Sequence, residues 1–227
     1  SSDLSLAGAT LQIEKAGIRG MASYDLLNNA AEAARITGGQ VTDVVNTIIA
    51  AQTLQVAKGE SVAQITATLV AANKMHMGSL DNLVNNLKGR VGATLAEFGV
   101  NLQTSTAFID IASKAGLTNA RALTSMLTSL NKLENPTKAQ AKAMESLGLS
   151  ADEVSKLMHK PDGLIEVMQR LRDISTKTGE PVSKIASTLF GAGGGATASV
   201  FINNVGQLTS AYKQLAGANP EIGRAHV

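Results

Sequence analysis

Glycine divides the first half of this sequence at nearly even intervals. Gly39, Gly59, Gly78, Gly99 and Gly116 lie 20, 19, 21 and 17 residues apart. The segments between them carry apolar residues at the three- and four-residue spacing of an amphipathic helix. Glycine often ends helices, because it adopts the left-handed backbone conformation without a steric penalty. The spacing therefore predicts helices of about 15 residues joined by short turns, a quasi-repeat of antiparallel hairpins over residues 1–118.

Composition favours helices over sheets. Hydrophobic residues make up 44% of the chain but aromatic residues only 3%, and there is no Trp. Sheets favour aromatic and β-branched side chains, whereas Ala, Leu and Met favour helices. Apolar stripes at helical spacing are Val41, Val45 and Ile48; Leu80, Leu83, Leu87, Val91, Leu95 and Phe98; Leu123, Met126, Leu127, Leu130 and Leu133; and Leu164, Met168 and Leu171. We therefore expect an all-α fold of stacked antiparallel helical hairpins or an irregular helical bundle.

Residues 119–220 form a second region, in which helix boundaries are marked more clearly. A helix is predicted to stop before Asn135-Pro136, because the residue before proline avoids the helical conformation. Side chains that can cap the next helix starts are Thr137 with Gln140, Ser150 with Glu153, and Asp162. A final stripe has the spacing of a coiled coil and suggests a short oligomerisation seam, formed by Phe201, Val205, Leu208, Tyr212 and Leu215.

The last seven residues, 221–227, match the translation of a laboratory sequence rather than a protein motif. Their final six, Ile-Gly-Arg-Ala-His-Val, are the in-frame translation of a common short-read sequencing adapter. We expect these residues to be read-through, in which case the sequence is a metagenomic fragment of a longer protein. Such a segment is left out of the fold prediction.

The longest uncharged stretch covers residues 185–212 and could be mistaken for a membrane span. It contains three consecutive glycines from Gly193 and the amides Asn203, Asn204 and Gln207, which interrupt the apolar character that spanning requires. The glycine-rich run 191–195 is also the one candidate phosphate cradle, but no Lys follows it before Lys213. A flexible turn between two helices in a soluble protein is the expected structure.

No catalytic, cofactor-binding or metal-binding residue is predicted. The histidines are His76, His159 and His226, and none has the paired ligands at one-turn spacing that a metal site needs; we expect solvent-facing side chains. There is no Cys, and no nucleophile motif accompanies the Ser and Thr residues. A net charge of +2 without clustered Lys and Arg argues against specific nucleic-acid binding. A non-enzymatic protein without cofactors is expected.

Several short motifs in residues 123–203 each mark a helix boundary. They are Pro136-Thr137 followed by Ala139 and Ala143; Leu147-Gly148-Leu149-Ser150; Pro161-Asp162-Gly163-Leu164; and Leu189-Phe190-Gly191. In this order and spacing they resemble the core region of phage tail tape measure proteins. Upstream, Phe98-Gly99-Val100 and Lys114-Ala115-Gly116-Leu117 are similar to helix-pairing steps of the same family. The turn after Phe190 is richer in glycine than the family pattern.

The resemblance implies a virion structural protein of a phage or prophage that sets tail length during tail assembly and assists genome ejection into the host. It implies the tail tube protein and tail assembly chaperones as partners, a homo-oligomer, and contact with the host inner membrane during ejection. The protein would be in the host cytoplasm before assembly and in the tail lumen of the virion afterwards. Two alternatives remain: a helical-repeat adaptor of a bacterial cell, whose repeat should continue evenly to the end, and a helical pore-forming protein that uses residues 185–212.

Overall fold

The computed structural model describes residues 2–117 and 120–218, with side chains outside residues 2–4 and 120–123. Every regular element in this part of the chain is a helix, which confirms the predicted all-α fold. The chain divides into two compact units, one formed by the described residues up to Lys88 and from Lys213 onward, the other by Gly89–Tyr212. The predicted division of the sequence falls on residues 118–119, and the predicted read-through on 221–227; both lie outside the described residues.

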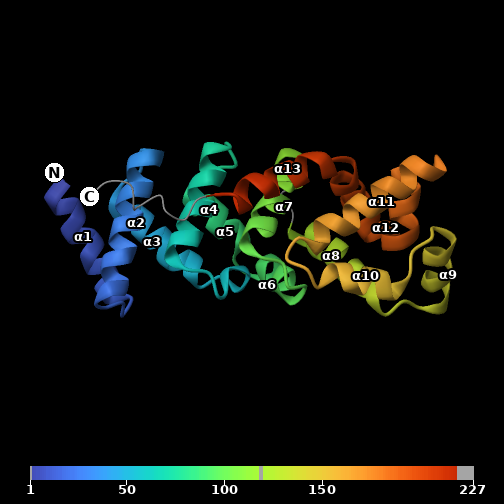
Figure 1. The fold of residues 1–227 in the computed structure, drawn as a ribbon, viewed down its shortest axis with the longest axis horizontal. Helices are drawn as coiled ribbons and strands as arrows, with labels where there is room; N and C mark the ends of the chain where they lie inside the picture. Colours follow the sequence, from blue (N-terminus) through green and yellow to red (C-terminus); the bar gives the residue numbers. More distant parts are fainter. Residues whose placement is uncertain (1, 118–119, 219–227) are drawn as a thin grey trace. The chain divides into compact units, whose positions relative to one another are not determined.

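The first unit consists of consecutive helices that pack against one another. They are α1 (Ser2–Lys15), α2 (Met21–Thr37), α3 (Val41–Gln52), the 3-10 helix η1 (Gln55–Ala57), α4 (Val62–Lys74) and α5 (Leu80–Leu87). Helix α3 contacts α1, α2, α4 and α5, so it lies at the centre of this unit. In Figure 1 it is drawn between α2 and α4. The Thr42 hydroxyl donates to the Ser5 carbonyl oxygen at 3.1 Å and joins α3 to α1.

The second unit is built around α8 and α12. Its helices are α6 (Arg90–Glu97), α7 (Leu102–Lys114), α8 (Ala120–Glu134), α9 (Lys138–Ser146), α10 (Ala151–Met158), α11 (Gly163–Thr178), α12 (Val182–Asn203) and the start of α13 (Val205–Ala216). Helix α12 contacts α7, α8, α9 and α11, and α8 also contacts α6 and α10. The buried rings of Phe108 and Phe201 have centroids 4.7 Å apart and join α7 to α12.

Several helices end in the same hydrogen-bonded turn. At Gly99, which has a φ of 70°, the Val100 N–H donates to the Leu95 carbonyl oxygen at 3.1 Å. This bond across a left-handed residue satisfies a carbonyl that the helix end would otherwise leave unpaired. Equivalent bonds cross Gly17, Gly116 and Gly148. Gly148, with a φ of 67°, is thus a left-handed cap at the helix boundary that the motif Leu147-Gly148-Leu149-Ser150 marks in the sequence.

Two of the predicted helix boundaries were misplaced. The left-handed residue that ends α2 is Gly38, with a φ of 74°, rather than the neighbouring Gly39. The apolar stripe over residues 80–98 was predicted as one helix but forms α5 and α6, because Gly89 adopts a φ of 75° between them. A lone glycine inside a helical pattern is usually tolerated, so its role as a break could not be read from the stripe.

The predicted helix starts are only partly correct. Helix α8 ends at Glu134, before Asn135-Pro136, and the capping box of Thr137 with Gln140 is present. Ser150 accepts from the Glu153 N–H at 3.1 Å, but the Glu153 side chain pairs with Arg170 instead of closing a capping box. Asp162 occupies the N-cap position of α11 and makes no side-chain cap bond. Its ψ of 11° departs from the extended backbone in which a capping side chain reaches the first turn.

The predicted seam residues pack within the chain. Phe201, Val205 and Leu208 are buried, and Asn204 separates α12 from α13 in the middle of the stripe. Met126, Leu127, Leu130 and Leu133 of the α8 stripe are buried as well, whereas the side chain of Leu123 lies outside the described residues. The coiled-coil spacing therefore reflects core packing in this structure.

Candidate functional site

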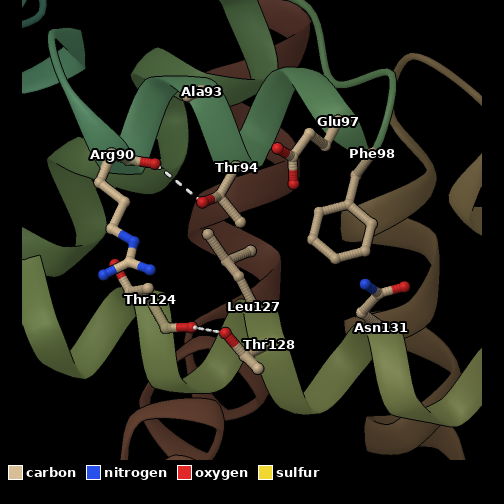
Figure 2. A pocket seen from close by; sticks show the side chains of 9 residues that line it. All are labelled: Arg90, Ala93, Thr94, Glu97, Phe98, Thr124, Leu127, Thr128 and Asn131. Carbon is tan, nitrogen blue, oxygen red and sulfur yellow. Dashed lines mark hydrogen bonds between the residues drawn. The ribbon is translucent and has the colours of Figure 1, made fainter.

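A polar cleft of about 230 Å³ lies between α6 and α8 in the second unit. Figure 2 shows that α6 supplies Arg90 and Glu97 and that Thr124 and Asn131 face them from α8. The full lining is Arg90, Ala93, Thr94, Glu97, Phe98, Thr124, Leu127, Thr128 and Asn131. The sequence did not reveal this cleft, because the cleft depends on the packing of α6 on α8.

The hydroxyl groups of the cleft are engaged within their own helices. Thr94 donates to the Arg90 carbonyl oxygen at 2.8 Å, and Thr128 donates to the Thr124 carbonyl oxygen at 2.8 Å (Figure 2). A hydroxyl that gives its proton to a backbone carbonyl is not held by a general base, which is what nucleophilic catalysis requires. The cleft therefore offers hydrogen-bonding groups to a small polar molecule but no activated nucleophile.

A smaller pocket of about 60 Å³ shares Glu97, Phe98 and Asn131 with the cleft and is also lined by Glu134 and His159. The Glu134 Oε1 atom is buried without a hydrogen-bond partner and lies 3.7 Å from His159 Nδ1. That ring nitrogen is 2.7 Å from the Ser155 carbonyl oxygen, which can only accept, so Nδ1 carries a proton. The two carboxylates and the imidazole do not assemble a metal site, because no group of three possible ligands is placed for one among the described residues.

The histidines lie where the sequence predicts. His76 and His159 are both exposed, on different units, while His226 lies outside the described residues. One property of His76 was not anticipated. Its φ is 59°, which makes it the one non-glycine residue with a positive φ in the described part of the chain.

The glycine-rich run contains the most unusual geometry in the second unit. The predicted turn exists, but it is confined to Gly191, whose φ of 68° and ψ of −175° break α12. Gly193, Gly194 and Gly195 belong to the helix that follows, which corrects the prediction of a turn over the whole run. Cβ atoms added at Gly193 and Gly194 would lie 3.0 Å and 3.1 Å from the hydroxyl oxygens of Ser125 and Ser129 on α8. The absence of side chains therefore lets α12 pack closely on α8.

By length and composition, Val182–Asn203 is also the one described helix that could cross a membrane, with a mean hydropathy of 1.4 over an 18-residue stretch of it. Core helices of soluble proteins pass the same test, and 56% of that stretch is buried inside the protein. The break at Gly191 leaves parts of 9 and 12 residues, each shorter than the roughly 20 residues that span a bilayer. In the folded form described here, α12 is a core element.

Comparison with known proteins gives one family. Residues 1–191 match the family described as phage-related minor tail protein. No curated protein and no solved structure matches the chain significantly. The matched region covers most of the chain and includes the helices from α1 to α11 together with the α12 residues that precede the break. The chain therefore belongs to the phage-related minor tail protein family, which makes it a structural component of a phage tail.

Proposed function

We propose that this chain is part of a tape measure protein, whose length determines how far the phage tail grows. The observation that carries the proposal is the family match over residues 1–191, which covers the motifs from Phe98-Gly99-Val100 through Leu189-Phe190-Gly191 in their expected order. The all-helical fold is consistent with this role, since helices rise by a constant distance per residue and so convert chain length into physical length.

The test is a change of tail length in the parent phage. Removing the codons of α9 and α10 in frame should shorten the tail in proportion to the residues lost, by about 1.5 Å per residue if the chain is drawn out as helix. Duplicating the same codons should lengthen it. Gly206→Ala changes an exposed helical position and is the matched control, with tails of normal length. Tails measured by electron microscopy that keep their length after deletion and duplication would reject the proposal.

The partners of such a protein would be the tail tube protein and tail assembly chaperones, with further copies of the chain beside it in the tail lumen. It would meet the chaperones in the host cytoplasm before assembly. Cross-linking of assembled tails, followed by mass spectrometry, should recover peptides of this chain joined to the tube protein. Cross-links only to surface proteins of the tail would place the chain elsewhere in the virion.

We further propose that the protein assists genome delivery by entering the host inner membrane during ejection. The supporting observation is the apolar character of Val182–Asn203. Flotation of the intact chain with vesicles of phosphatidylethanolamine and phosphatidylglycerol tests this step. A chain that remains with the unbound fraction at all lipid concentrations would contradict it.

The proposed role is non-enzymatic and needs no cofactor. The engaged hydroxyls of Thr94 and Thr128 support this view of the cleft between α6 and α8. The alternative of a bacterial helical-repeat adaptor predicts an evenly spaced repeat, whereas the described α-helices range from 8 residues in α5 to 22 in the broken α12. Tail tube and chaperone genes beside the reading frame would distinguish the tape measure from this adaptor.

A further inference from the structure

The two parts of α12 meet at a sharp bend. A Cβ atom added at Gly195 would lie 2.9 Å from the Cα atom of Ser187. These residues are eight positions apart, and eight residues of a straight α-helix extend about 12 Å along its axis. The close approach therefore means that the chain bends sharply between residues 182–190 and 192–203.

One residue produces this bend. Gly191 is the position inside α12 with a non-helical backbone, at a φ of 68° and a ψ of −175°. Glycine occupies positive and negative φ with similar ease, so a change in the two dihedral angles of Gly191 costs little locally. In the folded form no heavy atom lies within 4 Å of the place where a Cβ of residue 191 would sit. Resistance to opening therefore comes from the packing of the two helical parts rather than from residue 191 itself.

Contacts with α8 hold the bent form in place. The Ser129 hydroxyl oxygen lies 3.0 Å from the Ser125 carbonyl oxygen of its own helix and 3.2 Å from the Phe190 carbonyl oxygen at the break. Beyond the break, a Cβ at Gly194 would lie 3.3 Å from the Met126 Cα atom, so the two helix backbones pack closely. Close packing of this kind can be replaced by contacts with an apolar solvent.

We propose that Gly191 is a hinge on which α12 opens from a folded pair of short helices into one continuous helix when the protein meets a lipid bilayer. The opened helix Val182–Asn203 has 22 residues and would be about 33 Å long, which matches the roughly 30 Å hydrocarbon core of a bilayer. Lys184, near its first residue, is its one charged side chain. This inference rests on the proposed entry into the host membrane and supplies the conformational change that entry requires.

The distance between two labels across the hinge tests the proposal. The chain has no Cys, so Ser183→Cys with Ala196→Cys places spin labels at two exposed positions without removing a native thiol. In a continuous helix these positions lie about 20 Å apart along the axis, and the bend at Gly191 brings them closer together. Pulsed electron paramagnetic resonance should give a short distance in water. A second population near 20 Å should appear with vesicles of phosphatidylethanolamine and phosphatidylglycerol.

Gly191→Ala and Gly148→Ala form a matched pair of variants. Their φ angles are 68° and 67°, and neither site has a heavy atom within 4 Å of an added Cβ. Alanine disfavours positive φ at both sites, but only at residue 191 does a helical alternative join two helices. Gly191→Ala should therefore raise the ratio of open to folded distances about ten-fold and increase vesicle binding. Gly148→Ala should leave the label distances unchanged.

The outcomes separate the hinge from the membrane function. The hinge is wrong if the intact chain binds vesicles while keeping only the short distance, although membrane entry would then stand. It is also wrong if Gly148→Ala shifts the distances as much as Gly191→Ala. If no form of the chain binds vesicles, membrane entry and the hinge that depends on it both fail. A wild-type chain that opens on vesicles supports the hinge even if Gly191→Ala does not fold.

Discussion

Gly163 lies against the backbone of Leu157, so close that a Cβ atom at residue 163 would be 1.8 Å from the Leu157 carbonyl oxygen. The contact is made where α10 ends and α11 begins, within the motif Pro161-Asp162-Gly163-Leu164. The obstacle is backbone, which cannot rotate away as a side chain could. This explains why the turn requires glycine: the position has no room for any side chain, and its role is structural.

Gly163→Ala should be strongly destabilising. The added methyl group must push α10 and α11 apart, and overpacking against fixed backbone costs about 3 kcal/mol or more. Chemical denaturation monitored by circular dichroism measures the loss. Gly206→Ala is the control, because Gly206 is an exposed helical residue whose added Cβ would meet no atom within 4 Å. There alanine should stabilise by up to about 1 kcal/mol. Equal stabilities of the two variants would show that the turn adapts.

His76→Gly should be stabilising, although it removes a side chain. His76 adopts a φ of 59° at the end of α4, where the Met77 N–H donates to the Ala72 carbonyl oxygen at 3.0 Å across it. It occupies the position that glycine fills at other helix ends, and a left-handed conformation costs a non-glycine residue about 1 kcal/mol. Glycine also increases the freedom of the unfolded chain, which offsets part of this gain, so we expect the free energy of unfolding to rise by less than that amount.

His159→Gly is the matched control for this prediction. His159 is also exposed and follows a helix, but its φ is −81° and its ring bonds to the Ser155 carbonyl oxygen. Glycine relieves no strain there and increases the freedom of the unfolded chain, so stability should fall. If both histidine variants lose stability, His76 is not strained.

The sequence was most informative where one residue type determines local structure. The helix end before Asn135-Pro136, the Thr137 capping box and the Gly148 turn were all predicted correctly, because proline, short polar side chains and left-handed glycine act within one turn of helix. The family resemblance drew on the same residues, which is why it could be recognised without knowledge of the core.

Predictions failed where tertiary packing decides the structure. Gly193 and Gly194 favour a turn on their own, but their close approach to α8 offsets the cost of glycine in a helix. Gly89 breaks an otherwise regular stripe, and the helix that follows it packs on α8. The cleft between those helices depends on that packing, so no pattern within either segment could have revealed it.

Thr104→Val should be destabilising, and Thr106→Val nearly neutral. Both threonines are fully buried on α7. The Thr104 hydroxyl donates to the Pro161 carbonyl oxygen at 2.9 Å, in the turn before α11, whereas the Thr106 hydroxyl donates to Leu102 on its own helix. Valine at residue 104 leaves the Pro161 carbonyl without this donor, at a cost of about 1–2 kcal/mol.

Thr106→Val is the control, because it makes the same change of side-chain shape as Thr104→Val. The Leu102 carbonyl keeps its backbone bond when Thr106 becomes Val, so unfolding by urea should give a change below about 0.5 kcal/mol. Because both substitutions exchange a hydroxyl for a methyl group, a similar loss in the two variants would mean that valine packs poorly in this core. The contact between Thr104 and Pro161 would then not be the cause.

Tyr212 should ionise at higher pH in the folded protein than in the unfolded chain. Burial raises its pKa above the ordinary 10.0, the negative charge of Asp162 raises it further, and the side chain of Asn101 acts in the opposite direction through a hydrogen bond. The folded state therefore holds this proton more tightly, so the free energy of unfolding should fall as pH rises above 10.

Tyr24→Phe leaves Tyr212 as the one tyrosine, and absorbance at alkaline pH then follows it alone. The pH at which Tyr212 is half ionised should be lower when the same variant is unfolded in urea. Adding Asp162→Asn should lower the folded midpoint without removing the α11 cap, since the Asp162 side chain makes no cap bond. A folded midpoint equal to the unfolded one would show that the Tyr212 hydroxyl is solvated.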